Sequence, residues 1–416
     1  MAVTAVSTSS TREKLRNARS AAAHLAQLST EQKNNLLLEM AGAVEANAGG
    51  ILRANEEDMR HANLPESMRD RLLLTPERIK ESAGAVRDIA ALPDPVGEVL
   101  EEWDRPNGLR MRKIRVPLGV LGIVYESRPN VTVDAAALAF KSGNAAVLRG
   151  GKEAARSNQA LAEALTSVRS VPCGAIELLD SSTRESVQDL ITARGLVDVV
   201  IPRGGPELIS HVVENAIVPV IETGAGNCHI FVDESANLDM ASRIVLNAKT
   251  QRPSVCNAAE KLLVHASVAS VFIPRIVREL KGAGVELRGD QSTIRLVPGV
   301  SPATEEDWSE EYLRLCMAIR VVPGVEEAIE HINCYSTKHS EAIVTANEDH
   351  ARKFLRLVDS AAVYWNASTR FTDGGEFGFG AEMGVSTQKL HCRGPFALRE
   401  LTSTKYEIIG SGQVRG

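Results

Sequence analysis

The sequence predicts an α/β protein built on a parallel sheet with helices on both faces. Four short apolar runs have the length of buried strands, at residues 120–125, 145–148, 196–201 and 217–221. Helix-length segments such as 134–141 and 157–168 separate them, and this alternation is typical of a parallel sheet. Such sheets bind ligands beyond the carboxyl ends of their strands. Glycines occur near the ends of the expected strands, where that rule predicts a ligand site, at positions 143, 150, 151, 204, 205, 224 and 226.

The chain before these runs is expected to be helical from residue 11 to about residue 91. Ser29 to Gln32 can cap a helix that continues through Met40,. Thr75 and Pro76 open another helix, because proline suits the first helical position. Residues 1–10 lack a charged segment followed by a long apolar core, so we expect a frayed tail and not a signal peptide,.

After residue 95 the pattern changes to strands. Asn107 and Gly108 are a tight-turn signal,. Residues 109–116 then alternate apolar with basic side chains, as a half-exposed strand does,. Residues 401–409 are a second exposed strand with apolar alternation. Such strands need a partner to cover their edges, so a homo-oligomer is expected.

The composition fits a globular protein of two or three domains. The chain has 416 residues, of which 44% are hydrophobic, and this length is large for one core. A formal net charge of −6 argues against a general nucleic-acid binder,. No apolar run approaches the ~18 residues that span a bilayer. No membrane partner is therefore expected, and the protein should be cytoplasmic.

The cysteines and histidines do not form metal or disulfide motifs. The six cysteines lie far apart and show no CxxC spacing, and the nine histidines include no HExxH pair. This pattern predicts free thiols in a reducing compartment and no bound metal.

Cys256 is a candidate nucleophile. It stands in the polar segment 251–258, just ahead of the apolar run 261–265, whereas a cysteine that only fills a core usually lies inside such a run. The thiolate is the reactive form, and converging backbone N–H groups or a cation such as Arg252 lower a cysteine pKa from about 8.5 toward neutrality. The alternative is a buried structural thiol.

The glycine positions favour a nucleotide-binding enzyme, but the usual phosphate loops are missing. No GxGxxG follows a strand, and GxxxxGK[ST] does not occur,. Gly378, Gly380 and Gly384 resemble the first pattern superficially and are expected to form a turn. A dinucleotide would bind here without the standard pyrophosphate loop.

Taken in order, these residues resemble the cofactor half of the aldehyde dehydrogenase superfamily. The segments that carry the resemblance are 125–130, 141–144, 147–152, 202–205, 222–229 and Cys256. The segments 366–378, 386–391 and 393–395 resemble most closely those of the gamma-glutamyl phosphate reductase family, also called glutamate-5-semialdehyde dehydrogenase. The resemblance extends from about residue 12 to the end of the chain.

The resemblance implies NADPH-dependent reduction of L-glutamyl 5-phosphate to L-glutamate 5-semialdehyde, in proline biosynthesis. Cys256 would form a thioester, which is a good hydride acceptor. Asn130 matches the superfamily's oxyanion asparagine, aided by the Cys256 N–H; the alternative is that Asn130 turns the chain into the next helix. Its flank departs from the common form, because Arg128 and Pro129 replace an aromatic residue.

Glu222 matches a glutamate that activates water in hydrolytic relatives. A reductase would be harmed by that step, because water destroys the thioester. The remaining roles are proton transfer or orientation of the nicotinamide, and the alternative is a capping carboxylate.

The resemblance also implies cofactor-binding residues. Arg149 and Lys152 follow a strand end where relatives hold the adenosine ribose, and two cations suit the 2'-phosphate of NADPH. The alternative is a solvated basic pair. Gly204 and Gly205 belong to the cofactor half, and Glu311 matches the glutamate that holds the nicotinamide ribose.

Three further residues are candidates for binding the substrate. Ser368 and Arg370, in the loop 366–377, are expected to anchor its amino-acid end. Arg128, with the backbone N–H groups of residues 224–227, is expected to hold its phosphate.

The domain plan follows from the same resemblance. The NADP-binding domain would comprise residues 12–105, 120–233 and 363–388, the catalytic domain 234–362, and an oligomerisation flap 106–119 and 389–416. In the flap, 109–116 is expected to pair with 398–409. Besides the substrate and further copies of the chain, glutamate 5-kinase is a candidate partner.

Two other functions stay open on the sequence. One is a different superfamily member that acts on another acyl phosphate, an acyl-CoA or another aldehyde. The other is a cofactor-free cysteine hydrolase, for which His265 or His229 would have to be the base.

Overall fold

The computed structural model describes residues 10–62, 64 and 66–415 and divides into two compact units. The first unit comprises Met1–Glu222, Phe379–Gly384 and Phe396–Gly416, and the second comprises Thr223–Gly378 and Val385–Pro395. The tail expected over residues 1–10 lies outside the described residues, except for Ser10, whose hydroxyl caps the first helix.

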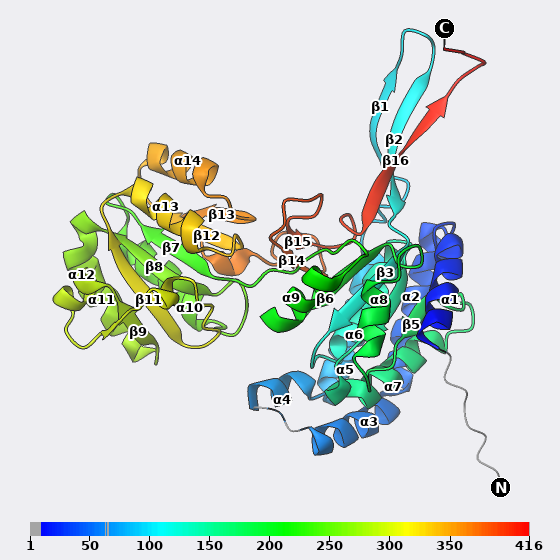
Figure 1. Ribbon diagram of the computed structural model, residues 1–416, viewed down its shortest axis with the longest axis horizontal. Helices are drawn as coiled ribbons and strands as arrows, with labels where there is room; N and C mark the ends of the chain where they lie inside the picture. The colour runs from blue at the N-terminus through cyan, green and yellow to red at the C-terminus, as the bar shows by residue number, and fades with distance from the viewer. Residues whose placement is uncertain (1–9, 63, 65, 416) are drawn as a thin grey trace. The chain divides into compact units, whose positions relative to one another are not determined.

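A series of helices opens the first unit, as the sequence predicts (Figure 1). They are α1 (Thr11–Leu25), α2 (Thr30–Ala46), α3 (Ala48–His61), α4 (Glu66–Leu72) and α5 (Pro76–Ala91). Ser29 and Gln32 form a complete capping box at the start of α2,. Thr75 accepts a hydrogen bond from the Arg78 N–H, and Pro76 is the first residue of α5. Both predicted helix starts are confirmed.

The first unit is built on a four-stranded parallel sheet of order β5-β4-β3-β6. Its strands are β3 (Val120–Tyr125), β4 (Ala145–Arg149), β5 (Ile176–Leu178) and β6 (Val199–Arg203). The associated helices are α6 (Asn130–Lys141), η1 (Lys152–Ala154), α7 (Ala155–Thr166), α8 (Glu185–Ile191) and α9 (Pro206–Asn215). The strand order reverses between β3 and β6, which is where open α/β sheets bind ligands.

The apolar run 217–221, expected as a further strand, forms only an isolated parallel bridge between Val220 and Val200. Pro219 explains the difference, because proline has no N–H to donate to a strand ladder.

Three antiparallel strands stand away from this sheet at the top of Figure 1. They are β1 (Val99–Asp104), β2 (Arg110–Pro117) and β16 (Thr402–Ile409), in the order β1-β2-β16. The expected pairing of 109–116 with 398–409 is confirmed by the ladder between β2 and β16. β1, which the sequence analysis did not identify as a strand of the flap, is the third strand. Gly108, at φ 85°, makes the turn that joins β1 to β2,.

The second unit has a seven-stranded parallel sheet of order β10-β9-β11-β8-β7-β12-β13. Its strands are β7 (Cys228–Val232), β8 (Ala259–His265), β9 (Glu286–Gly289), β10 (Ser301–Pro302), β11 (Cys316–Val322), β12 (Ser340–Val344) and β13 (Ala362–Trp365). The principal helices are α10 (Leu238–Thr250), α11 (Ala266–Gly282), α12 (Gln291–Leu296), α13 (Val325–Tyr335) and α14 (Glu348–Leu357).

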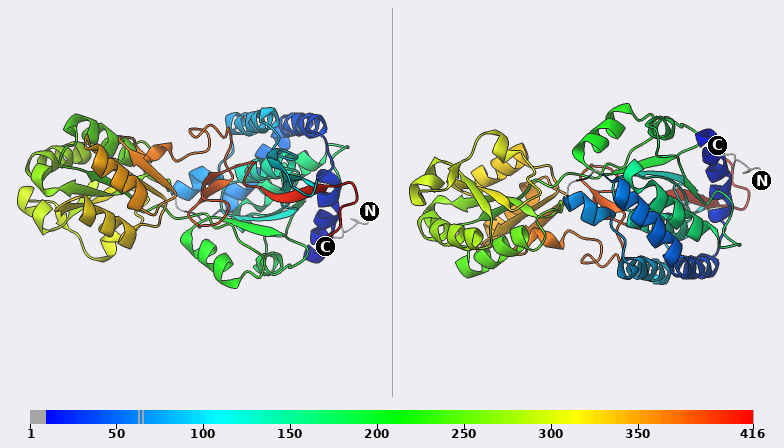
Figure 2. Two further views of the ribbon diagram at one scale, coloured as in Figure 1. Left: turned by 90° about the horizontal axis from the view of Figure 1, so that it is seen from above. Right: turned by 90° about the horizontal axis from the view of Figure 1, so that it is seen from below.

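Both faces of this sheet are covered by helices, as Figure 2 shows. Ile230 and Val232 of β7 pack with α10 and α11, whereas Phe231 between them packs with α13 and α14. Burial on both faces explains why the strands read as continuous apolar runs. The expected α/β class with parallel sheets is confirmed. Among the described residues, the helices are too short or too polar to cross a membrane.

Candidate active site

Cys256 lies in the turn that joins α10 to β8 in the second unit. Its side chain is partly exposed and forms no disulfide with another described residue. The Ala258 N–H donates to the Val255 carbonyl oxygen at 3.1 Å and closes the turn. Because this turn precedes β8, the cysteine stands at the amino end of its sheet. The sequence analysis expected ligands beyond the carboxyl ends of the strands, and that rule does not predict the position of Cys256.

The backbone before β7 packs directly on this turn. A Cβ added to Gly226 would lie 1.5 Å from the Cys256 carbonyl oxygen, so only glycine fits there,. The Cys228 thiol donates to the same carbonyl oxygen at 3.1 Å. Glu311 is brought to the same place, since its carboxylate accepts a 2.6 Å hydrogen bond from the Gly226 N–H. Burial raises the pKa of Glu311.

The loop 366–377 is hydrogen-bonded to the residue that follows the cysteine. The Asn257 amide donates to the Thr372 carbonyl at 2.9 Å and to the Arg370 carbonyl at 3.4 Å. In return, the Thr369 hydroxyl donates to the Asn257 carbonyl at 2.7 Å. The structure therefore brings the predicted substrate loop to the predicted nucleophile.

Ser368 and Arg370 occupy different positions within that loop. Ser368 is buried, and its hydroxyl accepts from the Arg370 N–H at the start of η3 (Thr369–Phe371). The Arg370 Nε donates to the Gln251 side chain at 2.7 Å. Burial lowers the pKa of Arg370, the positive charge of Arg252 lowers it further, and the Cys256 charge opposes both. Arg370 therefore interacts electrostatically with both Arg252 and Cys256.

In the first unit, Asn130 is the first residue of α6, which residues 126–129 connect to β3. It is exposed, and its amide donates to the Asp134 carboxylate at 3.1 Å. Burial raises the pKa of Asp134 to about 6, and the Asn130 hydrogen bond opposes the rise. Arg128 belongs to the same β3–α6 connection, which begins with Ser127 at φ 38°.

Arg149, the last residue of β4, and Lys152, which follows that strand, differ in their contacts. The Arg149 guanidinium donates to the carbonyl of Gly150 at 3.0 Å, to that of Thr183 at 2.8 Å and to the Ser186 hydroxyl at 3.3 Å. Its donors therefore hold the loop before α8. Lys152 is exposed and makes no ion pair with any residue that the structure describes.

Two glutamates at this sheet edge were not singled out from the sequence. Glu153 accepts from the Ser127 N–H at 2.8 Å and from its hydroxyl at 2.6 Å, which stabilises the positive φ of Ser127. Glu126 accepts from the Gly205 N–H at 2.8 Å, and a Cβ on Gly204 would lie 2.5 Å from its Oε2. Gly204 and Gly205 thus accommodate a carboxylate at the start of α9.

Glu222 is partly buried and is the last residue of the first segment of the first unit. Among residues that the sequence analysis left out of the site, Asn257 carries the most contacts with it. Its position next to Cys256 was the available indication.

Comparison with known proteins identifies the family of the chain. The chain matches the aldehyde dehydrogenase family over residues 1–312. It is 68% identical to the gamma-glutamyl phosphate reductase of Koribacter versatilis, over 97% of this chain and 100% of that protein. The crystal structure of gamma-glutamyl phosphate reductase from Thermotoga maritima has a TM-score of 0.96 at 50% identity and covers 98% of this chain and 100% of its own.

The fold extends to more distant enzymes. An acetylating aldehyde dehydrogenase from Geobacillus thermoglucosidasius has a TM-score of 0.69 at 20% identity, covering 98% of this chain and 97% of its own. The family resemblance inferred from the motifs is confirmed. The chain is an oxidoreductase that belongs to the aldehyde dehydrogenase family and, within it, to the gamma-glutamyl phosphate reductases.

Proposed function

We propose that the enzyme reduces L-glutamyl 5-phosphate to L-glutamate 5-semialdehyde and phosphate, as a step of proline biosynthesis. The observation that carries the proposal is the 68% identity, over the full length of the relative, to a protein named gamma-glutamyl phosphate reductase. The partly exposed Cys256 supplies the nucleophile that this chemistry requires,.

In the proposed reaction, the Cys256 thiolate attacks the carbonyl carbon and forms a thioester. The positive charges of Arg252 and Arg370 favour the thiolate, because opposite charge nearby stabilises the ionised form. Asn130 and the Cys256 N–H are the proposed donors to the oxyanion. Glu222 is proposed to move a proton or to orient the nicotinamide.

NADPH is the proposed cofactor and, when bound, supplies the hydride. The donor set of the first unit fits it in part. Lys152 is an exposed cation without a carboxylate partner among the described residues, which suits a 2'-phosphate,. Arg149 is less suited to bind the 2'-phosphate, because its guanidinium already donates hydrogen bonds to backbone carbonyls. Gly204 and Gly205 are proposed to lie beside the cofactor, and Glu311 to hold its nicotinamide ribose.

We assign the expected domains in the same way. Residues 12–105, 120–233 and 363–388 are the proposed NADP-binding domain, 234–362 the catalytic domain, and 106–119 with 389–416 the flap. Cytoplasmic location, assembly into a homo-oligomer and contact with glutamate 5-kinase belong to this proposal.

The hydrolase alternative finds no support at its two candidate histidines. Burial lowers the pKa of His229 to about 3, and the ring is fully buried. His265 caps α11, where its side chain accepts from the Ser267 N–H. Neither is placed as a general base for Cys256.

The decisive experiment is oxidation of glutamate 5-semialdehyde with NADP, with and without phosphate. We expect turnover to fall to a small residual rate in phosphate-free buffer and to return with phosphate or arsenate, because the thioester is released to an oxyanion. Cys256→Ser should lose activity by several orders of magnitude, and Cys173→Ser should keep it. Equal rates without an oxyanion, with glutamate as product, would contradict the reductase assignment.

A further inference from the structure

Two arginines belong to the segments that carry or contact the nucleophile. Arg252 follows α10, and Arg370 lies in η3. Neither forms an ion pair within the part of the chain that the structure describes. Some other arginines of the second unit do form ion pairs, as Arg288 does with Asp307 and Arg393 with Asp359.

The two arginines are held near each other by contacts that do not involve a substrate. The Arg370 Nε bonds to Gln251, the residue before Arg252, at 2.7 Å. The Arg370 backbone is fixed from the other side, since its carbonyl accepts from Asn257, the residue after Cys256. Residues 251 to 257 and the loop 366–377 therefore meet around the cysteine.

The loop carries a carboxylate of its own, Asp373, whose charge raises the pKa of Arg370 but whose oxygen bonds to backbone N–H groups. The Asp373 Oδ1 accepts from the Gly375 N–H at 2.9 Å and from the Glu376 N–H at 3.3 Å. Two neighbouring cations repel each other. This repulsion is present at Arg370, whose pKa burial and Arg252 both lower. A bound dianion would relieve it.

We propose that Arg252 and Arg370 together bind the phosphate group of the acyl phosphate and, in the reverse direction, inorganic phosphate. This inference rests on the proposed function and deepens it. Arg370 is now assigned to the phosphate and no longer to the amino-acid end of the substrate. Arg252 is added to the site. Guanidinium forks match phosphate oxygens in geometry and charge.

The position suits the leaving group. When the thiolate sulfur bonds to the carbonyl carbon, the bond from that carbon to the phosphate oxygen breaks and its electron pair stays on the oxygen. The phosphate takes up one proton from solvent and departs as the dianion. Cations at that oxygen stabilise the charge that develops there. In the reverse direction, the same cations hold phosphate for attack on the thioester.

Steady-state kinetics in the oxidative direction separate the two anionic groups of the substrate. Glutamate 5-semialdehyde retains the carboxylate, whereas phosphate is a second substrate with its own KM. In Arg252→Gln, we expect the KM for phosphate to rise at least tenfold and the KM for the semialdehyde to stay within about twofold. A rise in the semialdehyde KM alone would assign Arg252 to the carboxylate and overturn the proposal, as would unchanged values for both.

A second measurement does not depend on turnover. Neutral iodoacetamide alkylates Cys256, and mass spectrometry of the peptide distinguishes it from exposed Cys173 and Cys334. At constant ionic strength, phosphate should slow alkylation of Cys256 in the unmodified enzyme in a saturable manner. The protection ratio should approach one in Arg252→Gln and in Arg370→Gln.

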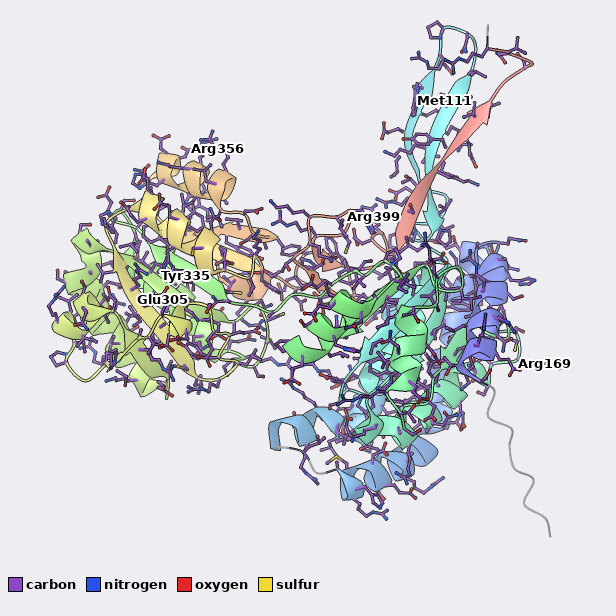
Figure 3. The ribbon with its side chains drawn as sticks, viewed as in Figure 1. Met111, Arg169, Glu305, Tyr335, Arg356 and Arg399 are labelled. Atoms are coloured by element: carbon purple, nitrogen blue, oxygen red, sulfur yellow. The ribbon has the colours of Figure 1, made fainter. Side chains whose placement is uncertain are left out.

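The matched control is Arg356→Gln, because Arg356 is an exposed arginine on α14 in the same unit (Figure 3). It should keep both the phosphate KM and the protection. Absence of protection in the unmodified enzyme, or undiminished protection in both variants, would overturn the phosphate site. Protection without NADP-linked oxidation would leave the site standing and contradict the proposed function instead.

Discussion

Asn257 shows how a single side chain links the nucleophile to the loop that faces it. Its amide donates to two carbonyls of the loop, and its own carbonyl accepts from Thr369. The Oδ1 atom is buried without a hydrogen-bond partner among the described residues. A buried acceptor without a partner costs about 1–3 kcal/mol, so stability alone does not favour asparagine here. We infer that it positions Cys256 against the loop.

Asn257→Ala should therefore impair turnover more than folding. Loss of hydrogen bonds worth about 1 kcal/mol each should reduce kcat/KM by roughly tenfold or more. The pH dependence of Cys256 alkylation should change as well, because Arg370 is no longer held. Asn333→Ala is the control, since the Asn333 amide also makes two hydrogen bonds to backbone, donating to the Leu357 carbonyl and accepting from the Asp359 N–H. Equal effects of the two substitutions on kcat/KM would refute a positioning role.

The second residue-scale prediction concerns cofactor choice. Lys152→Glu should weaken NADPH binding and shift preference toward NADH, because a charge-assisted contact to the 2'-phosphate is worth about 1.5–3 kcal/mol. Arg149→Gln should instead lower the melting temperature, because its guanidinium holds the carbonyls before α8. Kd values for both cofactors and thermal melts check this. Unchanged selectivity in Lys152→Glu would place 2'-phosphate recognition elsewhere.

At this scale the sequence predicts residue types better than their contacts. The polar setting of Cys256 was enough to identify a candidate nucleophile, and the structure places it in a partly exposed turn. The difference between Arg149 and Lys152 was not readable, because it depends on carbonyls more than 30 residues away. Glu126 and Glu153 were missed for the same reason: they bond to backbone N–H groups that only the folded sheet edge brings near.

At the scale of elements, the sequence predicted helix starts and strands correctly where neighbouring residues determine them. The caps at Ser29 and Thr75 and the alternating strand at 109–116 were readable because the deciding residues are neighbours in sequence. β1 was not, since Val99–Asp104 carries acidic residues and finds its place by pairing with β2. The run 217–221 was wrongly predicted as a strand, because the prediction relied on its apolar composition and neglected Pro219.

The pairing of β7 with β12 carries a prediction about pH. Glu341 of β12 stands opposite His229 of β7, and both are fully buried. Burial raises the pKa of Glu341 to about 8 and lowers that of His229 to about 3. The pKa of this carboxyl group is lowered in part by hydrogen bonds from Ser336 and Ser360 and by the positive charge of His339. Both groups are therefore neutral over most of the range in which the protein is studied.

A raised pKa in the folded state means that folding favours the protonated acid. The stabilisation is complete below the unfolded value near 4.5 and is lost as the pH rises through about 8,. The free energy of unfolding should therefore fall more steeply from pH 5 to pH 8.5 in the native sequence than in Glu341→Gln. Urea titrations followed by tryptophan fluorescence measure this, and Glu330→Gln on the exposed side of α13 is the control. Parallel slopes would show that Glu341 does not titrate in this range.

At the scale of the whole molecule, the units are discontinuous in sequence. The chain returns to the first unit at Phe379–Gly384 and again at Phe396–Gly416, so that β16 pairs with β2 across more than 280 residues. Hydrophobic periodicity alone cannot predict which distant strand pairs with β2. The pairing with β16 was predicted from the resemblance to the family.

The flap formed by β1, β2 and β16 presents one apolar face. Trp103, Met111 and Ile408 lie opposite one another across the three strands, and Tyr406 packs edge-on against Trp103 at 6.2 Å. Ile408 and Tyr406 are 59% and 57% exposed in the single chain. Met111 can be found on this ribbon in Figure 3. Exposed apolar faces on edge strands are typical of surfaces that a partner covers, and we expect a second copy of the chain there.

Ile408→Asp tests this expectation. Because Ile408 is exposed in the isolated chain, the substitution should leave the fold of the first unit intact and change its melting temperature little,. Burying an unpaired charge in an interface is costly, so the mass measured by light scattering should fall toward that of one chain of 44.8 kDa. Ser403→Asp is the control, because Ser403 is also exposed and lies on the opposite face of β16,. If both variants keep the mass of the native assembly, or if both dissociate, the apolar face of the flap is not the surface that joins the copies.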